Sequence, residues 1–213
     1  MKVFVLGIDV NRASCDPTLY PELDPYQRAQ SQHLDETARK IADFTADARD
    51  YAPFAWGMQL SDTRPGHERD YTLQEAAFHR VIPFPMEDDF LPKTQMSPYP
   101  EHKPYFEAKK QAGEDTAVLL GFYAPECIYW AMNDLVKNGF RVVLPTDLVA
   151  AAHPSHPMEH FEEFMFDAGQ GKIIFTNADR TLSMLQTPED RRVLPVPLYD
   201  YNDLHQMYFG PGS

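Results

Sequence analysis

One of the two cysteines, Cys127, lies where a thiol can act as a nucleophile. It follows an apolar run over residues 117–120 and a turn containing Gly121, and a helix is expected to begin around it. The first turn of a helix carries unpaired backbone N–H groups and the positive end of the helix dipole. This environment lowers the pKa of a thiol and favours the thiolate, which attacks carbonyl carbon. A strand, a glycine turn and a nucleophile on the next helix indicate acyl chemistry.

Two charged residues, Asp9 and Lys93, complete the candidate chemistry. Asp9 ends an apolar run over residues 3–8, and Lys93 ends a short predicted strand over 90–93. A carboxylate whose pKa is raised by burial can take the proton of a thiol, and a lysine beside both groups stabilises the thiolate. Backbone N–H groups at the turn before Cys127 can stabilise an oxyanion. We therefore expect attack on an amide-type carbonyl, release of an amine and hydrolysis of a thioester.

The segments that carry these residues alternate between strand and helix. Apolar runs predict strands over 3–8, 53–60, 90–93, 117–120, 140–144 and 172–176. Helices are expected after the Asp24-Pro25 cap and over 102–111, 127–137, 157–168 and 177–185. The alternation predicts an α/β fold with three α/β/α layers and a mostly parallel, Rossmann-like sheet of about six strands. Ligands of such sheets bind at the carboxyl ends of the strands.

Length and charge limit the classes of function. The chain has 213 residues and a net charge of −13, so we expect one domain over 1–213 that binds neither nucleic acid nor an anionic membrane. No apolar run is long enough to span a bilayer, and the run over 3–8 is too short for a signal peptide. Cys15 and Cys127 form no disulfide framework. These features predict a cytoplasmic protein.

Other residues that attract attention have ordinary explanations. We interpret Cys15 as a small buried hydrophobe. His153, His156 and His160 lie near one another, but prolines interrupt the segment and no acidic pair accompanies them, so we expect no metal and no cofactor. The aromatic segment over about 188–213 is expected to pack on the domain or on a partner subunit.

Three blocks of the sequence, taken in order, resemble the isochorismatase-like cysteine hydrolases. This superfamily includes nicotinamidases, N-carbamoylsarcosine amidases and ureidoacrylate amidohydrolases. Residues 5–9 look like its first strand with a catalytic aspartate, and residues 93–99 are similar to its Lys-x-x-x-Ser-Ala-Phe motif. Residues 121–128, continued by 139–147, are similar to its nucleophile block. The resemblance covers most of residues 3–185.

The resemblance implies roles for individual residues. Asp9 would be the general base and then acid, Lys93 would stabilise the thiolate and orient the aspartate, and Cys127 would be the nucleophile. A non-proline cis peptide would join Phe122 to Tyr123, and the backbone N–H groups of Tyr123 and Cys127 would form the oxyanion hole. A homodimer or a higher homo-oligomer is also implied.

The chain departs from the family pattern at several positions. Asn11 replaces a glutamine after the first strand, and Arg64 stands where nicotinamidases place a metal-binding histidine, so a metal is not expected and Arg64 can instead bind a substrate carboxylate. Phe122 and Tyr123 replace small residues of the pocket. We therefore take Asn11, Arg64, Phe122 and Tyr123 as candidate substrate-binding residues.

Two alternatives to an amidohydrolase stay open from the sequence. Hydrolysis of the vinyl ether of isochorismate needs no thiol nucleophile, so Cys127 argues mildly against it. The second alternative is a binding protein that has the same fold and no activity.

Overall fold

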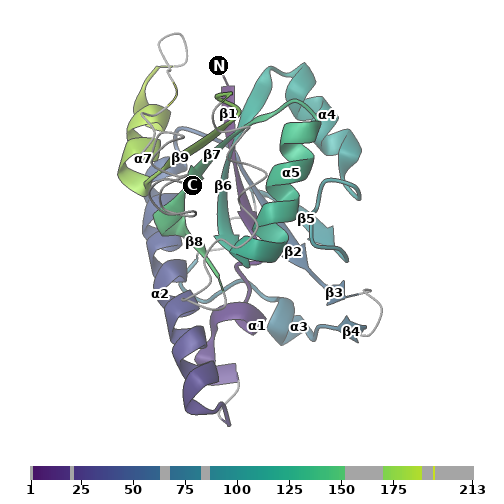
Figure 1. The fold of residues 1–213 in the computed structure, drawn as a ribbon, viewed down its shortest axis with the longest axis vertical. Helices are drawn as coiled ribbons and strands as arrows, with labels where there is room; N and C mark the ends of the chain where they lie inside the picture. Colours follow the sequence, from purple (N-terminus) through teal and green to yellow (C-terminus); the bar gives the residue numbers. More distant parts are fainter. Residues whose placement is uncertain are drawn as a thin grey trace, which may run out of the picture.

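A parallel sheet forms the centre of the protein in the computed structural model, which describes residues 2–19, 22–62, 68–82, 87–151, 170–188 and Leu194. The sheet has seven strands in the order β5-β2-β1-β6-β7-β9, and β8 also pairs with β6 (Figure 1). Its strands are β1 (Lys2–Ile8), β2 (Phe54–Gln59), β5 (Asp89–Lys93), β6 (Glu114–Phe122), β7 (Arg141–Pro145), β8 (Val149–Ala150) and β9 (Ile173–Thr176). A separate antiparallel ribbon pairs β3 (Ser61–Asp62) with β4 (Arg69–Asp70).

Helices cover both faces of this sheet. They are α1 (Arg12–Cys15), α2 (Pro25–Ala48), α3 (Leu73–Ala76), α4 (Lys103–Gln111), α5 (Tyr129–Lys137) and α7 (Ala178–Gln186). Short helical turns occur at η1 (Pro17–Leu19), η2 (Ala124–Ile128) and η3 (Thr146–Leu148). In Figure 1, α2 and α7 lie on one side of the sheet and α4 and α5 on the other. The predicted three-layer α/β/α fold is confirmed.

The side chains of β1 show why both faces are covered. Phe4 and Leu6 belong to the apolar cluster that includes residues of α4 and α5, whereas Val3 and Val5 belong to the cluster that includes residues of α2 and α7. Successive side chains of a strand point to opposite faces, so a strand that is apolar at every position needs a helical layer on each side.

Local sequence signals mark several element boundaries correctly. Asp24 accepts a hydrogen bond from the backbone N–H of Gln27 (2.8 Å), and the Gln27 side chain accepts one from the Asp24 N–H, so α2 begins with a capping box. Asn177 is the N-cap of α7, as expected, and its side chain accepts a hydrogen bond from the backbone N–H of Arg180. The strand predicted over 117–120 is longer, because β6 extends to Glu114 and Phe122. The helix expected over 157–168 and most of the aromatic segment lie outside the described residues.

The chain order creates a crevice between β1 and β6. The chain passes from β1 to β2 and then β5 on one side, and it returns to β6 on the other side of β1. The carboxyl ends of two strands that are followed by connections in opposite directions form the usual ligand site of an open parallel sheet. The residues that follow β1 and β6 therefore meet at this crevice.

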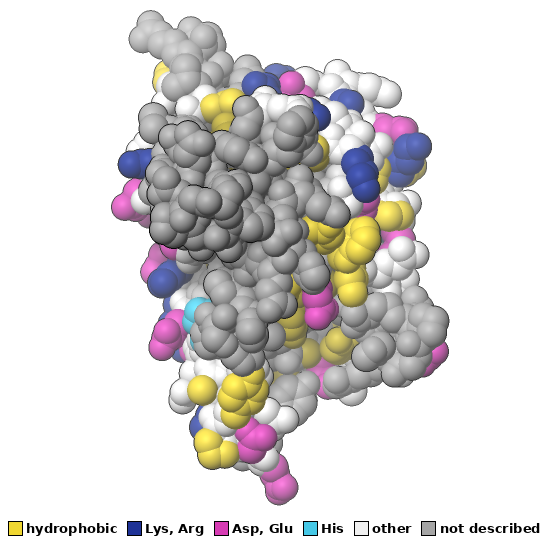
Figure 2. All heavy atoms as spheres, viewed as in Figure 1, with side chains coloured by type: hydrophobic (Ala, Val, Ile, Leu, Met, Phe, Trp, Pro, Cys, Tyr) yellow, Lys and Arg dark blue, Asp and Glu magenta, His cyan; other side chains and the backbone are white. Residues whose placement is uncertain are grey.

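The surface has mixed charge. On the face shown in Figure 2, basic side chains lie among acidic ones. None of the helices in the described ranges has the length and apolar character that crossing a bilayer requires.

Gly121 allows β1 and β6 to approach each other at this crevice, and we expect Gly121→Ala to destabilise the fold. Gly121 has a φ of +124°, and an added Cβ would overlap the carbonyl oxygen of Ile8. We expect a loss of about 3 kcal/mol in the free energy of unfolding, because a backbone penalty and a backbone clash are combined. Urea denaturation measures this loss.

Gly113→Ala is the matched control, since Gly113 has a φ of +81° and no atom within 4 Å of an added Cβ. It should lose only about 1 kcal/mol, the backbone penalty alone. Equal losses in the two variants would show that the β1–β6 contact does not require glycine.

Candidate active site

A buried ion pair joins the first and third parallel strands of the chain. The Asp9 carboxylate, directly after β1, lies 2.8 Å from Nζ of Lys93, the last residue of β5. Lys93 is 0% exposed and Asp9 is 1% exposed. The other Asp9 oxygen accepts a hydrogen bond from the backbone N–H of Gln59 (2.9 Å), and Lys93 Nζ also donates to the carbonyl of Gln95 (3.1 Å). Each charge therefore has a second polar partner.

The thiol of Cys127 contacts the same lysine. Nζ of Lys93 donates to Cys127 Sγ at 3.6 Å, and Cys127 is 3% exposed. The structure thus brings together Asp9, Lys93 and Cys127, which the sequence separates by up to 118 positions (127 − 9). Asp9 and Lys93 lie at the carboxyl ends of β1 and β5, and Cys127 lies in the helical turn after β6.

The backbone is strained where two of these elements end. Among the residues that the structure describes, the non-glycine residues with positive φ are Asp9 (53°) and Tyr123 (63°). A left-handed conformation costs a non-glycine residue about 1–2 kcal/mol and is often found at functional sites. The strain here is confined to the residues that follow β1 and β6.

The expectation of a cis peptide between Phe122 and Tyr123 is wrong, because no peptide bond in the described ranges is cis. The chain changes direction after β6 through the left-handed conformation of Tyr123 (φ 63°, ψ 60°). Sequence similarity identified the turn but not the torsion angle that produces it.

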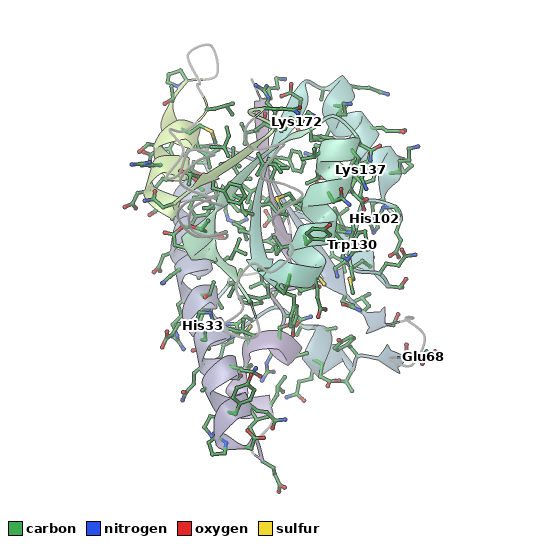
Figure 3. The ribbon with its side chains drawn as sticks, in the orientation of Figure 1. His33, Glu68, His102, Trp130, Lys137 and Lys172 are labelled. Atoms are coloured by element: carbon green, nitrogen blue, oxygen red, sulfur yellow. The ribbon has the colours of Figure 1, made fainter. Side chains whose placement is uncertain are left out.

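Cys127 lies in a wide helical turn rather than in a regular α-helix. In η2 the N–H of Ile128 bonds to the carbonyl of Tyr123 (3.2 Å), an i to i+5 bond, and the N–H of Glu126 bonds to the same carbonyl (2.9 Å). The N–H of Cys127 is not among the donors to that carbonyl. Such π-helical turns are rare and occur often at functional sites. Trp130, labelled in Figure 3 on α5, is 44% exposed, so the helix turns Cys127 inward and Trp130 outward.

The electrostatic state of the thiol differs from the expectation. Burial, and next the negative charge of Asp9, raise the pKa of Cys127 well above its ordinary value, although Lys93 acts in the opposite direction. Burial disfavours the charged form of Lys93, but the neighbouring Asp9 and Cys127 raise its pKa above the ordinary value. The predicted low thiol pKa is therefore wrong for the unliganded site, because desolvation outweighs the helix start and the lysine. The site holds a neutral thiol beside an ion pair.

The candidate substrate-binding residues are dispersed. The side-chain oxygen of Asn11 caps α1, accepting from the N–H (2.9 Å) and hydroxyl (2.6 Å) of Ser14. The side chain of Phe122 is in the core on the α2 face, and Arg64 lies outside the described residues. Tyr123 is half-buried beside the site.

Two contributors to the site could not be recognised from the sequence. Gln59 acts through its backbone N–H, which every residue except proline has, and Gln95 acts through its carbonyl, which every residue has. Cys15 is fully buried and its thiol donates to the Asn11 carbonyl (2.9 Å), which agrees with its structural interpretation. Within the described ranges, no cluster of three or more histidine, cysteine or acidic side chains is arranged to bind a metal.

Comparisons with known proteins agree on one family. A family model described as the isochorismatase domain matches residues 5–178. An N-carbamoylsarcosine amidase from Thermoplasma acidophilum has a similar structure, with a TM-score of 0.61 and 17% identity over 84% of this chain and 98% of that one. An isochorismatase family protein from Desulfovibrio vulgaris gives a TM-score of 0.66 and 16% identity over 87% and 99% of the two chains.

A nicotinamidase/pyrazinamidase from Bacillus subtilis is also similar, with a TM-score of 0.58 and 14% identity over 76% of this chain and 95% of that one. At these identities the solved structures support the fold alone. Among curated proteins nothing matches significantly.

Because the negative charge of Asp9 raises the pKa of Cys127, replacing Asp9 should make the Cys127 thiol react faster. In the wild type, alkylation of Cys127 by iodoacetamide should be slow at pH 7.5 and still rise above pH 9, because the thiol pKa is raised. Asp9→Asn removes an anion that raises this pKa and leaves the Lys93 cation that lowers it. We expect alkylation at pH 7.5 to accelerate about tenfold or more, since each pKa unit changes the thiolate fraction tenfold.

Mass spectrometry of the Cys127 peptide measures the rate, and Asp16→Asn is the control. Asp16 is also buried (1% exposed) but is paired with Arg12. The Asp16→Asn variant should therefore keep the alkylation rate of Cys127 within about twofold of the wild type. An unchanged rate in Asp9→Asn would mean that Asp9 does not control the thiol, and a slower rate would mean that Asp9 promotes thiolate formation, the opposite of the expected sign.

Proposed function

The chain belongs to the isochorismatase family, and on this premise we propose that it is a cysteine hydrolase that cleaves the C–N bond of a small amide, carbamoyl or ureido compound. The observation that carries the proposal is the buried contact of Cys127 and Asp9 with the same lysine. In this proposal Cys127 is the nucleophile, Asp9 is the general base and then acid, and Lys93 is the cation that stabilises the anionic group beside it.

The proposed first step is a proton transfer that creates no new buried net charge. The Cys127 proton passes to Asp9 as sulfur attacks the substrate carbonyl carbon. Lys93, 2.8 Å from the carboxylate and 3.6 Å from the sulfur, is the counter-ion of Asp9 before the step and of the thiolate during it. Moving one negative charge between two partners of a fixed cation avoids the large cost of burying an unpaired ion.

The later steps return the proton. Asp9 gives it to the leaving amine as the C–N bond breaks, which leaves a thioester on Cys127. Asp9 then takes a proton from a water molecule that attacks the thioester and gives it to the sulfur, which leaves as the thiol. The backbone N–H groups of Tyr123 and Cys127 are the proposed donors to the oxyanion in both steps.

A vinyl-ether hydrolase is the second candidate, because the family takes its name from that reaction. In that reaction the Asp9 carboxyl group would protonate the vinyl carbon, water would add to the oxocarbenium ion, and the hemiketal would break into a carbonyl compound and an alcohol. The thiol would take no part. The contact between Lys93 and the Cys127 sulfur favours the amidohydrolase, since a thiol that takes no part in the reaction gains nothing from a cation beside it.

A trapping experiment tests the proposed thioester. We expect that hydroxylamine, added with a panel of small amide and ureido compounds, will give a hydroxamate or N-hydroxyurea product from at least one compound. Cys127→Ala should reduce this product at least about 10⁴-fold, the scale of losing a nucleophile, while keeping its thermal unfolding midpoint. Mass spectrometry measures the product.

Cys15→Ala is the matched control, because it removes the other buried thiol. The folded fraction of Cys15→Ala should form the trapped product at the rate of the wild type. Retained turnover in Cys127→Ala would exclude the thioester mechanism, and retained hydrolysis of isochorismate in that variant would support the vinyl-ether alternative.

A further inference from the structure

We propose that the side chain of Tyr123, held by Ser14, limits the size of the group that reaches Cys127 and restricts the enzyme to small acyl groups such as carbamoyl or acetyl. The statement about substrates rests on the proposed function. The steric barrier itself concerns only access to the Cys127 thiol and does not depend on that function.

Tyr123 lies across the carboxyl edge of the sheet. It directly follows β6, whose residue Gly121 is paired with Ile8 immediately before Asp9. Its side chain packs against both apolar clusters, the one on the α4–α5 face and the one on the α2–α7 face. Because the sheet separates these clusters, a side chain can contact both only by lying over the strand ends. The phenol therefore lies over the crevice between β1 and β6.

Ser14 holds the far end of this side chain. A hydrogen bond joins the Tyr123 hydroxyl to the side chain of Ser14 in α1. The Ser14 hydroxyl also bonds to the side-chain oxygen of Asn11 (2.6 Å), which holds Ser14 in place within α1. The side chain thus extends from the end of β6 to the helix that follows β1. Burial, the main cause, keeps the pKa of Tyr123 well above its ordinary value, so the phenol stays neutral.

Tyr123 lies beside the proposed nucleophile. Its side chain packs against the apolar cluster that contains Cys127, and its carbonyl accepts hydrogen bonds from the N–H groups of Glu126 and Ile128, on either side of Cys127. A side chain that is anchored at both ends and lies beside the nucleophile restricts the volume available to the acyl part of a substrate. A bulky substituent next to the carbonyl would have to displace the ring and break the hydrogen bond with Ser14.

The backbone at this position favours a residue without a side chain. Tyr123 has a φ of 63° and a ψ of 60°, a conformation that glycine adopts without penalty. Replacement by glycine therefore removes the ring and relieves backbone strain at the same time. This makes Tyr123→Gly a suitable test variant, because loss of backbone stability does not accompany loss of the ring.

Two alkylating agents of different size test the barrier. Iodoacetamide and N-phenyl-iodoacetamide each form a bond between the Cys127 sulfur and a CH₂ carbon with release of iodide, and both need the thiolate. The ratio of their rates cancels the thiolate fraction and reports steric access. Glutathione gives the ratio for a free thiol, and mass spectrometry of the Cys127 peptide gives it for the protein.

We expect the wild type to favour iodoacetamide over the phenyl compound about tenfold more than glutathione does, within the range by which pockets discriminate size. Tyr123→Gly should bring the ratio to within about twofold of glutathione. Tyr123→Phe and Ser14→Ala, which keep a ring but lose the hydrogen bond, should give intermediate ratios. Trp130→Ala, an exposed aromatic on α5, should match the wild type.

A wild-type ratio equal to that of glutathione, or a Tyr123→Gly ratio equal to that of the wild type, would overturn the proposal. Circular dichroism melting identifies variants that do not fold. If Tyr123→Gly does not fold, a Tyr123→Phe ratio between those of the wild type and glutathione supports the proposal, and a ratio equal to that of the wild type contradicts it. Failure of this test is separate from failure of the proposed function, because alkylation needs no turnover and the hydroxylamine experiment needs no barrier.

Discussion

The buried ion pair between Asp9 and Lys93 is the interaction on which the candidate site depends. Transferring either charge from water to the interior costs several kcal/mol, so each ion is tolerated there only because the other lies 2.8 Å away and backbone groups of Gln59 and Gln95 supply further hydrogen bonds. The pair also decides the state of Cys127. Because Lys93 is already neutralised by Asp9, it cannot hold the thiol ionised in the absence of substrate.

The parallel sheet is what makes such a pair possible. Its strands are buried on both faces and end together at one edge, so three residues distant in sequence converge there on a rigid base. The positive φ angles at Asp9 and Tyr123 show that the chain leaves β1 and β6 under local strain. The surrounding packing maintains this strain, and it fixes the directions in which the carboxylate and the π-helical turn point.

The chain shares its fold with the solved structures but differs from the family pattern at several residues near the site. The solved structures described above share 14–17% identity with it, yet their folds cover three quarters or more of its length. The candidate residues Asp9 and Lys93 lie at strand ends and Cys127 lies in the turn after β6, whereas Asn11, Phe122 and Tyr123 depart from the family pattern. Asn11 and Tyr123 lie beside the crevice, whereas Phe122 belongs to the apolar cluster on the α2 face, so the departures affect both the surroundings of the site and the core.

Although it did not predict the short elements β3, β4, β8, α1 and α3, the sequence by itself determined the alternation of the main strands and helices, the caps at Asp24 and Asn177, and the three residues that meet at the site. These features depend on local periodicity, on hydrogen bonds over three or four residues, and on motif blocks whose order can be read along the chain. The tertiary structure decided that Cys127 is a neutral buried thiol, that Tyr123 turns through a left-handed conformation, that Asn11 caps α1, and that Phe122 is in the core. The pKa of a thiol depends on how many atoms exclude water from it and on charges from distant segments, and a side chain's direction depends on the packing of its neighbours, so neither can be obtained from local sequence.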